Sequence, residues 1–169
     1  PVPFLEQLAS ETLDWAKVTV SLADERWVPV EHADSNAGLL ARHLLKGAAA
    51  KARFVGLYQQ ADNLDTAAGK ADQALLALPP IDVLVLGMGD DGHTASLFPR
   101  MQHLDDALAS QAAYVSVDAT GCPGAGKFLR RISLTPAGLA PAHTRLLLIR
   151  GEAKRKLLDR VLDGDDARE

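Results

Sequence analysis

PPIDVLVLGMGDDGHTASLFP, at residues 79–99, is the stretch from which the fold can be inferred. Two prolines end the preceding element, and residues 81–86 form an apolar run rich in β-branched side chains. The run is too short for a typical helix, so it predicts a strand that is buried on both faces. A glycine-containing loop follows, with Asp91 and His93 just beyond the strand's end. Ligands bind at the carboxyl ends of strands in open α/β sheets, which makes this loop the first candidate site.

On either side of this stretch, apolar residues alternate between the spacing of strands and the spacing of helices. Such alternation predicts an α/β fold with a largely parallel sheet covered by helices on both faces. No repeat or long linker interrupts the pattern, so we expect one domain over residues 1–169. Strands are expected at residues 18–23, 54–58, 81–86, 113–117, 131–134 and 145–149, and helices at 2–12, 34–46, 63–78 and 152–162, with shorter helices from about Ala95 and from Thr135. Residues 118–127 are expected to be loop, and the polar tail from residue 164 to be frayed.

Composition narrows the functional classes. With 47% hydrophobic and 24% charged residues, the chain resembles an ordinary globular protein. A formal charge of −4 argues against a general nucleic-acid surface, which needs clustered Lys and Arg. The single cysteine, Cys122, excludes an internal disulfide and fits a reducing cytoplasm. No apolar run approaches the ~20 residues that span a membrane.

The loop after the central strand carries the strongest chemical pattern. His93 lies two residues from Asp91, a carboxylate close enough to orient the imidazole as a general base. The alternative is a histidine that only satisfies loop carbonyls. Gly87, Gly89 and Gly92 allow sharp turns and a close approach to a ligand, so we count them as substrate-binding. They also match G-x-G-x-x-G, but two aspartates stand where a dinucleotide's pyrophosphate would lie, so this cofactor is disfavoured.

Two further clusters carry charge. Asp24-Glu25-Arg26 follows the expected strand at 18–23 and is either a solvated cap or an anion site, in which the guanidinium of Arg26 would bind an oxyanion. The second cluster follows the glycine-rich loop and is either a phosphate site or a solvated edge. It comprises Lys127, Arg130 and Arg131.

Metal and serine-nucleophile chemistry are poorly supported. The five histidines are scattered, with no pair at helical metal-ligand spacing and no paired cysteines. No G-x-S-x-G elbow occurs, and Thr94 and Ser96 beside His93 lack the strained turn of a serine nucleophile. We therefore expect no metal and no cofactor.

Three stretches resemble the 6-phosphogluconolactonase family: LADERWVPVEHADSNAGLL at 22–40, DVLVLGMGDDGHTASLFP at 82–99 and RISLTP at 131–136. The resemblance implies a three-layer α/β/α Rossmann-like fold, shared with glucosamine-6-phosphate deaminases. It also implies cytoplasmic hydrolysis of 6-phospho-D-glucono-1,5-lactone in the oxidative pentose phosphate pathway, by a monomer or weak homodimer that binds neither nucleic acid nor membrane. The deaminases look like DEY where this chain has Asp24-Glu25-Arg26. After the DGH motif they continue toward F-N-E-P, whereas this chain continues with TASLFP, the lactonase pattern.

The resemblance also assigns roles. His93 is expected to be the general base, oriented by Asp91 or Asp24, with Arg26 stabilising the oxyanion or anchoring the substrate. Lys127 with Arg130 or Arg131 is expected to bind the 6-phosphate, although Lys127 is displaced by about one residue from the family's spacing. Asn36 joins the substrate-binding residues.

The family's phosphate loop precedes a Thr-Pro or Ser-Pro pair, and Pro1 matches that proline. We therefore expect an amino-terminal strand and this loop to be missing from the chain. The alternatives to lactone hydrolysis are sugar-phosphate deamination and a non-catalytic regulatory domain that binds sugar phosphates.

Overall fold

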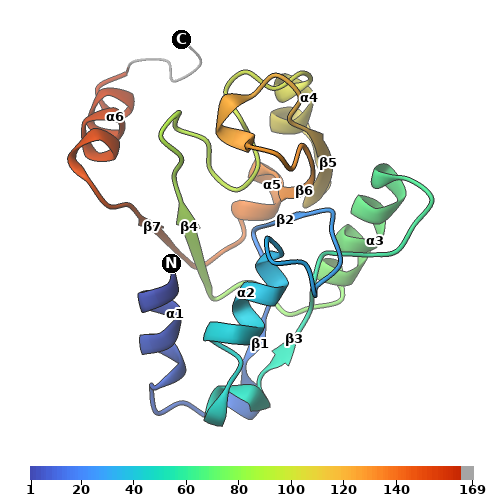
Figure 1. The fold of residues 1–169 in the computed structure, drawn as a ribbon, viewed down its shortest axis with the longest axis vertical. Coiled ribbons are helices and arrows are strands. Elements are labelled where there is room, and N and C mark those ends of the chain that lie inside the picture. Colours follow the sequence, from blue (N-terminus) through green and yellow to red (C-terminus); the bar gives the residue numbers. More distant parts are fainter. Residues whose placement is uncertain (165–169) are drawn as a thin grey trace.

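Helices and strands follow one another through the whole computed structural model, which describes residues 1–164 (Figure 1). The helices are α1 (Val2–Ala9), α2 (Asn36–His43), α3 (Leu64–Leu76), α4 (Leu104–Ala109), α5 (Pro136–Leu139) and α6 (Glu152–Leu162). The strands are β1 (Thr19–Val20), β2 (Asp24–Arg26), β3 (Arg53–Phe54), β4 (Val83–Gly87), β5 (Tyr114–Asp118), β6 (Arg130–Leu134) and β7 (Thr144–Leu148). The predicted frayed tail lies, beyond residue 164, outside the described residues.

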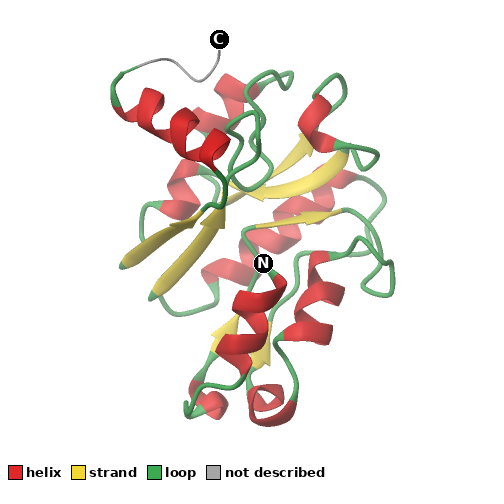
Figure 2. Cartoon of the chain, turned by 60° about the vertical axis from the view of Figure 1, so that its left-hand side comes forward, coloured by secondary structure: helices red, strands yellow, loops and turns green. Residues whose placement is uncertain are grey.

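The strands form three sheets, and their pairing confirms the α/β class. Strands β1 and β3 pair in parallel, as do β4 and β7, which agrees with the predicted parallel arrangement. The third sheet, in the order β2-β6-β5, is antiparallel, a feature that the alternating pattern did not predict. Its origin is local, because β5 and β6 are joined by a loop without a helical crossover, and antiparallel strands alone permit such a link. In Figure 2 the short β1–β3 pair lies apart from the other strands.

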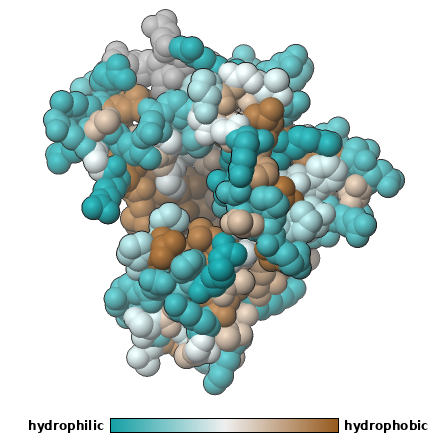
Figure 3. Space-filling model, in the orientation of Figure 1, coloured by the Kyte–Doolittle hydropathy of each residue, from teal (hydrophilic) through white to brown (hydrophobic). Residues whose placement is uncertain are grey.

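The prediction that the central strand is buried on both faces is wrong. In β4, Leu84 is buried, whereas the side chain of Val83 is 55% exposed. The parallel register pairs Val83 with Thr144 and Val85 with Leu146, so alternating side chains place all four on one face of the sheet. Within residues 1–164 that face is largely open, and Figure 3 shows apolar residues gathered in the hollow beside β4 and β7.

Three clusters of buried apolar side chains hold the described part of the chain together. One packs α3 and Leu84 of β4 against the antiparallel sheet, and a second lies between α1, α2 and Trp15. The third gathers around Phe98, which is fully buried, and includes Val117 of β5. This last cluster lies directly beneath the loop that carries His93, and it makes a firm base for the candidate site.

Helix starts follow the capping residues in the sequence. Ser35 accepts a hydrogen bond from the backbone of Gly38 at the start of α2, and Asn63 does the same at the start of α3. The short helix expected from Ala95 is wrong: turns occupy this region and α4 begins only at Leu104. Ala95 has a φ of +50°, in the left-handed region that a helix excludes, which explains the difference. None of the helices in residues 1–164 has the length and apolarity needed to cross a bilayer.

Candidate functional site

His93 and Asp91 form the central pair of the candidate site. The imidazole Nδ1 lies 2.6 Å from Asp91 Oδ1, and the same carboxylate oxygen accepts a bond of 3.2 Å from the His93 backbone N–H. Gly92, with a φ of +87°, makes the turn between them possible. The carboxylate in contact with the ring is therefore that of Asp91, whereas Asp24 bonds to Asn36 and Ser96.

The glycines around this pair make room for it. A Cβ atom on Gly89 would lie 2.2 Å from His93 Nδ1, and a Cβ atom on Gly124 would lie 2.3 Å from Asp91 Oδ2. Both positions thus require glycine, because the two side chains lie directly against their backbones. The space over Gly89 that a dinucleotide-binding loop would leave for a ligand is occupied here by an imidazole. Gly87 has no atom within 4 Å of the corresponding position.

The protonation of the pair follows from the state of Asp91. Burial alone would raise its pKa, but the hydrogen bonds and charge of His93 outweigh this effect and hold the pKa below the ordinary 3.8. Asp91 is therefore ionised at neutral pH and can only accept, so Nδ1 of His93 must carry the proton it shares with Asp91. In the neutral imidazole the lone pair is then on Nε2, the nitrogen that faces away from Asp91. This is the tautomer that a general base needs.

The ring of His93 is held by packing as well as by Asp91. It lies 4.3 Å from the ring of Phe98, centroid to centroid, and its side chain is 19% exposed. A ring that is partly exposed yet fixed on one edge and one face can reach solvent without losing its orientation.

The charged triplet is a strand, and this corrects the prediction that it lies at a strand's carboxyl end. It forms β2, in which Asp24, Glu25 and Arg26 pair with Ser133, Ile132 and Arg131 of β6. Because side chains alternate along a strand, Glu25 faces the side opposite to Asp24 and Arg26.

Glu25 is fully buried against the first turn of α2. Its oxygens accept bonds from the backbone N–H groups of Asn36 (2.8 Å) and Ala37 (2.7 Å) and from the Ser35 hydroxyl (3.0 Å). A carboxylate is stabilised at a helix N-terminus by free N–H groups and the helix dipole. Burial nevertheless dominates and raises the pKa of Glu25 above the ordinary 4.5.

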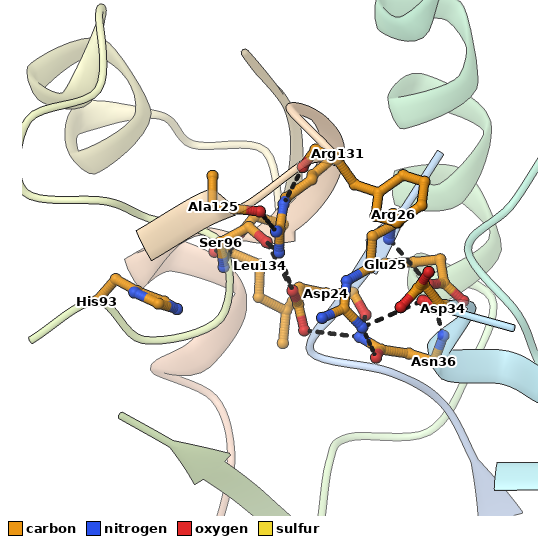
Figure 4. Close-up of polar contacts among 12 residues, drawn as sticks. Asp24, Glu25, Arg26, Asp34, Asn36, His93, Ser96, Ala125, Arg131 and Leu134 are labelled. Carbon is orange, nitrogen blue, oxygen red and sulfur yellow. Dashed lines mark hydrogen bonds and ion pairs between the residues drawn. The ribbon is translucent and has the colours of Figure 1, made fainter. Parts of the chain in front are cut away.

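Asn36 links the two outer members of the triplet. Its side-chain amide donates to the Asp24 backbone carbonyl (2.9 Å) and to Asp24 Oδ1 (3.1 Å), while its oxygen accepts from Arg26 Nη1. Within the described residues, Arg26 Nε is buried without a partner. In Figure 4 the guanidinium of Arg26 and the ring of His93 point toward each other across the site. Asn36, expected to bind substrate, thus already holds Asp24 and Arg26 in place.

Ser96 joins this cluster to the histidine loop. Its hydroxyl donates to Asp24 Oδ2 at 2.6 Å, and its backbone N–H donates to the Ser133 hydroxyl at 3.0 Å. Both serines are completely buried. Ser96, three positions after His93, therefore links β2 to the histidine loop, a role that the sequence did not predict.

The three basic residues of the second cluster separate in the structure. Arg131 is buried, at 5% exposure, and points into the molecule toward Asp24 and Ser96. Lys127 is exposed and forms an ion pair of 3.2 Å with Asp34, and Arg130 lies over the ring of Trp27. Only the last two present their charges at the surface, where a phosphate could meet them.

Lys154, on α6, is a residue that the sequence analysis missed. Its ammonium donates to the Met88 carbonyl at 2.7 Å and lies 3.5 Å from Asp90 Oδ1. Both partners belong to the loop that carries His93, so a cation from the last helix meets the site. Nothing distinguishes Lys154 in the sequence from the neighbouring charges of an amphipathic helix.

The structure brings several of the predicted residues into one region, and Figure 4 shows five of them: Asp24, Arg26, Asn36, His93 and Arg131. The assembled site comprises His93, Asp91, Gly89, Gly92, Asp24, Arg26 and Asn36, with Arg131 behind it and Lys127 and Arg130 exposed. In residues 1–164, no group of three or more His, Cys, Asp or Glu side chains is arranged to hold a metal ion. An imidazole held by a carboxylate, an arginine and exposed cations suit acid–base attack on an anionic substrate.

Comparison with known proteins assigns the chain to a family. The family model described as glucosamine-6-phosphate isomerases/6-phosphogluconolactonase matches residues 1–169. A 6-phosphogluconolactonase from Pseudomonas putida is 65% identical over 171 residues, which covers 100% of this chain and 69% of that protein. The corresponding protein of Pseudomonas aeruginosa is 55% identical, with 99% of this chain and 70% of that protein covered.

Solved structures agree with this assignment. A crystal structure of a 6-phosphogluconolactonase from Shewanella baltica superposes with a TM-score of 0.90 at 36% identity, covering 99% of this chain and 70% of that one. A monomeric glucosamine-6-phosphate deaminase shares the fold, with a TM-score of 0.75 at 18% identity over 99% of this chain and 73% of that one. The chain belongs to the glucosamine-6-phosphate isomerase/6-phosphogluconolactonase family, and relatives up to 65% identical to it are named 6-phosphogluconolactonase.

Proposed function

We propose that this chain hydrolyses 6-phospho-D-glucono-1,5-lactone to 6-phospho-D-gluconate, a step of the oxidative pentose phosphate pathway. The observation that carries the proposal is the Asp91–His93 pair, which fixes an imidazole with its basic nitrogen directed away from the carboxylate. The relatives named 6-phosphogluconolactonase, at up to 65% identity, support the choice of substrate. A lactone is an ester, and a positioned base suffices to open it with water.

His93 is the general base of the proposed reaction. Its Nε2 takes a proton from a water molecule while the water oxygen attacks the lactone carbonyl carbon. When the tetrahedral intermediate collapses, the bond between this carbon and the ring oxygen breaks, and Nε2 returns its proton to the ring oxygen. The products are a hydroxyl group and a carboxylic acid, which ionises. Asp91 holds the ring and stabilises its charged form between the two transfers.

Arg26 is the proposed electrostatic partner of this base. Negative charge develops on the carbonyl oxygen during attack, and a fixed cation lowers its energy most where water is excluded. Asn36 and the Asp34 backbone carbonyl hold Nη1 of Arg26, so the guanidinium is fixed before the substrate arrives. Asp24, which bonds Asn36 and Ser96, keeps this arrangement in register with the histidine loop.

The substrate's phosphate requires cations that can reach it. We propose Lys127 and Arg130, which are exposed, and Lys154, which lies against the histidine loop, as the candidates. Each would form charge-assisted bonds with phosphate oxygens. We further propose that the chain works as one domain in the cytoplasm, as a monomer or weak homodimer. Size-exclusion chromatography with light scattering tests the oligomeric part.

The test of the base is a His93→Asn variant. Its rate of acid release from freshly prepared lactone, corrected for spontaneous hydrolysis, should fall about 10²–10⁴-fold, the usual contribution of a general base. His103→Asn is the matched control, because His103 also pairs with an aspartate, Asp106 at 3.0 Å, on an exposed helix end. A His93→Asn rate within a factor of about three of the parent would exclude the base role. Ammonia release from glucosamine 6-phosphate by the parent would instead favour the deaminase reaction.

A further inference from the structure

The buried guanidinium of Arg131 is fully engaged inside the molecule. Its Nε donates to the Phe128 carbonyl at 2.8 Å and its Nη2 to the Ala125 carbonyl at 2.6 Å. Its Nη1 donates to the Ser96 hydroxyl at 3.3 Å and lies 3.8 Å from Asp24 Oδ2. All three nitrogens thus have partners, and the side chain is nearly inaccessible to solvent. A phosphate would have to displace these bonds to reach it.

One connection runs from Arg131 to Asp91 through the loop that joins β5 to β6. The Ala125 carbonyl, which Arg131 holds, adjoins Gly124, and the backbone of Gly124 lies directly against the Asp91 carboxylate. By binding the Ala125 carbonyl, Arg131 therefore also fixes the neighbouring backbone of Gly124, against which the Asp91 carboxylate packs. The same guanidinium makes a second hydrogen bond to this loop, at the Phe128 carbonyl.

A second connection runs through Phe98. The guanidinium carbon of Arg131 lies 5.2 Å from the centre of this ring, and the imidazole of His93 lies 4.3 Å from it. Phe98 itself is fully buried. Arg131 therefore contacts, from behind, both surfaces that fix the pair: the loop against Asp91 and the ring against His93.

We propose that Arg131 is a positioning residue for the Asp91–His93 pair and does not bind the substrate's phosphate. The kinetic part of this inference rests on the lactone hydrolysis proposed above. The guanidinium binds two carbonyls and a hydroxyl through three nitrogens at separate positions, whereas a lysine carries its donors on one nitrogen and cannot reach all three acceptors. Loss of any of these bonds would loosen the loop and let the pair separate without removing either member.

The direct test is Arg131→Lys, which keeps the charge and loses the fork. The turnover number kcat should fall about 10- to 100-fold, while KM and the dissociation constant of 6-phosphogluconate, measured by calorimetry, stay within about threefold. Arg53→Lys, in the exposed part of β3, is the control and should leave both constants unchanged. A phosphate ligand would give the opposite split, with KM and product affinity weakened about tenfold or more and kcat nearly kept. That split, or an unchanged kcat, overturns the proposal.

A readout without substrate separates this inference from the proposed function. The proton shared by His93 Nδ1 and Asp91 at 2.6 Å should give a downfield proton resonance in the unliganded protein, identified by its loss in Asp91→Asn. This resonance should shift or broaden in folded Arg131→Lys and persist in Arg53→Lys. If Arg131 had a purely structural role, Arg131→Lys would lower the unfolding temperature but leave this resonance unchanged. If the parent chain does not hydrolyse the lactone, the proposed function is wrong, and this resonance alone then tests whether Arg131 positions the Asp91–His93 pair.

Gly124→Ala provides an independent variant should Arg131→Lys not fold. The added methyl group meets Asp91 directly while Arg131 keeps its bonds, so the same loss of kcat and the same change in resonance are expected. Unchanged kcat and an unchanged resonance in Gly124→Ala would show that the loop does not position Asp91, and would overturn the inference.

Discussion

Asp91 does two things at the scale of a single residue: it orients an imidazole, and it makes part of the stability depend on pH. Its pKa in the folded chain lies below the ordinary 3.8 because the bonds and charge of His93 outweigh the effect of burial. A carboxyl group of this kind stabilises the fold above its unfolded pKa. The contribution is lost as the pH falls through the lower folded value.

The Asp91→Asn variant should therefore be less stable than the parent near neutral pH, and this loss of stability should be smaller in acid. The free energy of unfolding of the parent should exceed that of the variant near neutral pH, and the difference should shrink as the pH falls below about 3.8. Urea unfolding at a series of pH values measures it. Asp62→Asn, at an exposed position before α3, is the control. A difference that grows in acid would contradict the assignment of the hydrogen bond to the ionised form of Asp91.

The sequence indicated this residue pair, with Asp24 as the alternative carboxylate, but it did not indicate the surroundings of the pair. Asp91 and His93 are two positions apart, so their contact follows from the local chain and could be predicted. Arg131 could not be placed, because three basic residues after a glycine-rich loop look alike whether their charges point outward or into the molecule. The contact from Asp24 to Ser96 joins positions 72 residues apart, and no local pattern encodes such a distance.

At the scale of elements, the start of α2 controls the geometry of β2. Glu25 binds the first N–H groups of the helix, and Asn36 in that same turn bonds both Asp24 and Arg26. The helix terminus thus links a buried carboxylate on one side of the strand to the site residues on the other. Capping residues made α2 predictable from Asp34-Ser35-Asn36. This use of Glu25 was not predictable, because the sequence left the charged triplet open between a solvated cap and an anion site.

Glu25→Gln should destabilise this element. An amide has one oxygen where the carboxylate has two, so about two of the buried donors now bound by Glu25 lose their acceptor. Each such loss costs about 1–3 kcal/mol, so two losses predict a decrease of about 2–6 kcal/mol in the free energy of unfolding. Chemical denaturation compares it with Glu31→Gln, an exposed position before the helix. A decrease of less than about 0.5 kcal/mol would show that the cap contributes little.

At the scale of the whole molecule, local patterns predicted the elements better than their assembly. The strands at 113–117 and 131–134 were found within a residue or so, but their antiparallel pairing was not, since pattern alone does not give direction. The same limit explains why β4 was wrongly predicted to be buried on both faces. An apolar run shows that a strand can be buried, but the elements packed around the strand decide which of its faces is buried. The prediction of a helix from Ala95 failed because Ala95 has a left-handed backbone and the next residue, Ser96, bonds to Ser133 and Asp24 in distant parts of the chain.

The open face of the β4–β7 sheet should be measurable. Val83, Leu146 and Leu148 expose 55%, 42% and 44% of their surface, a contiguous apolar area that favours association. Replacing Val83 and Leu146 together by threonine, which suits a strand, should reduce the fluorescence of a bound apolar dye and the light scattering several-fold. The rate of lactone hydrolysis should not change. Equal dye binding by parent and variant would show that this face is covered in solution.

Gly89 has a consequence for mutational tolerance. Even alanine there would occupy the position of the His93 ring, and Gly124 is restricted in the same way from a different part of the chain. The two smallest side chains of the site are thus among its least replaceable. In a library of all single substitutions, positions 89 and 124 should be depleted as strongly as His93 itself. An inventory of reactive groups would overlook both.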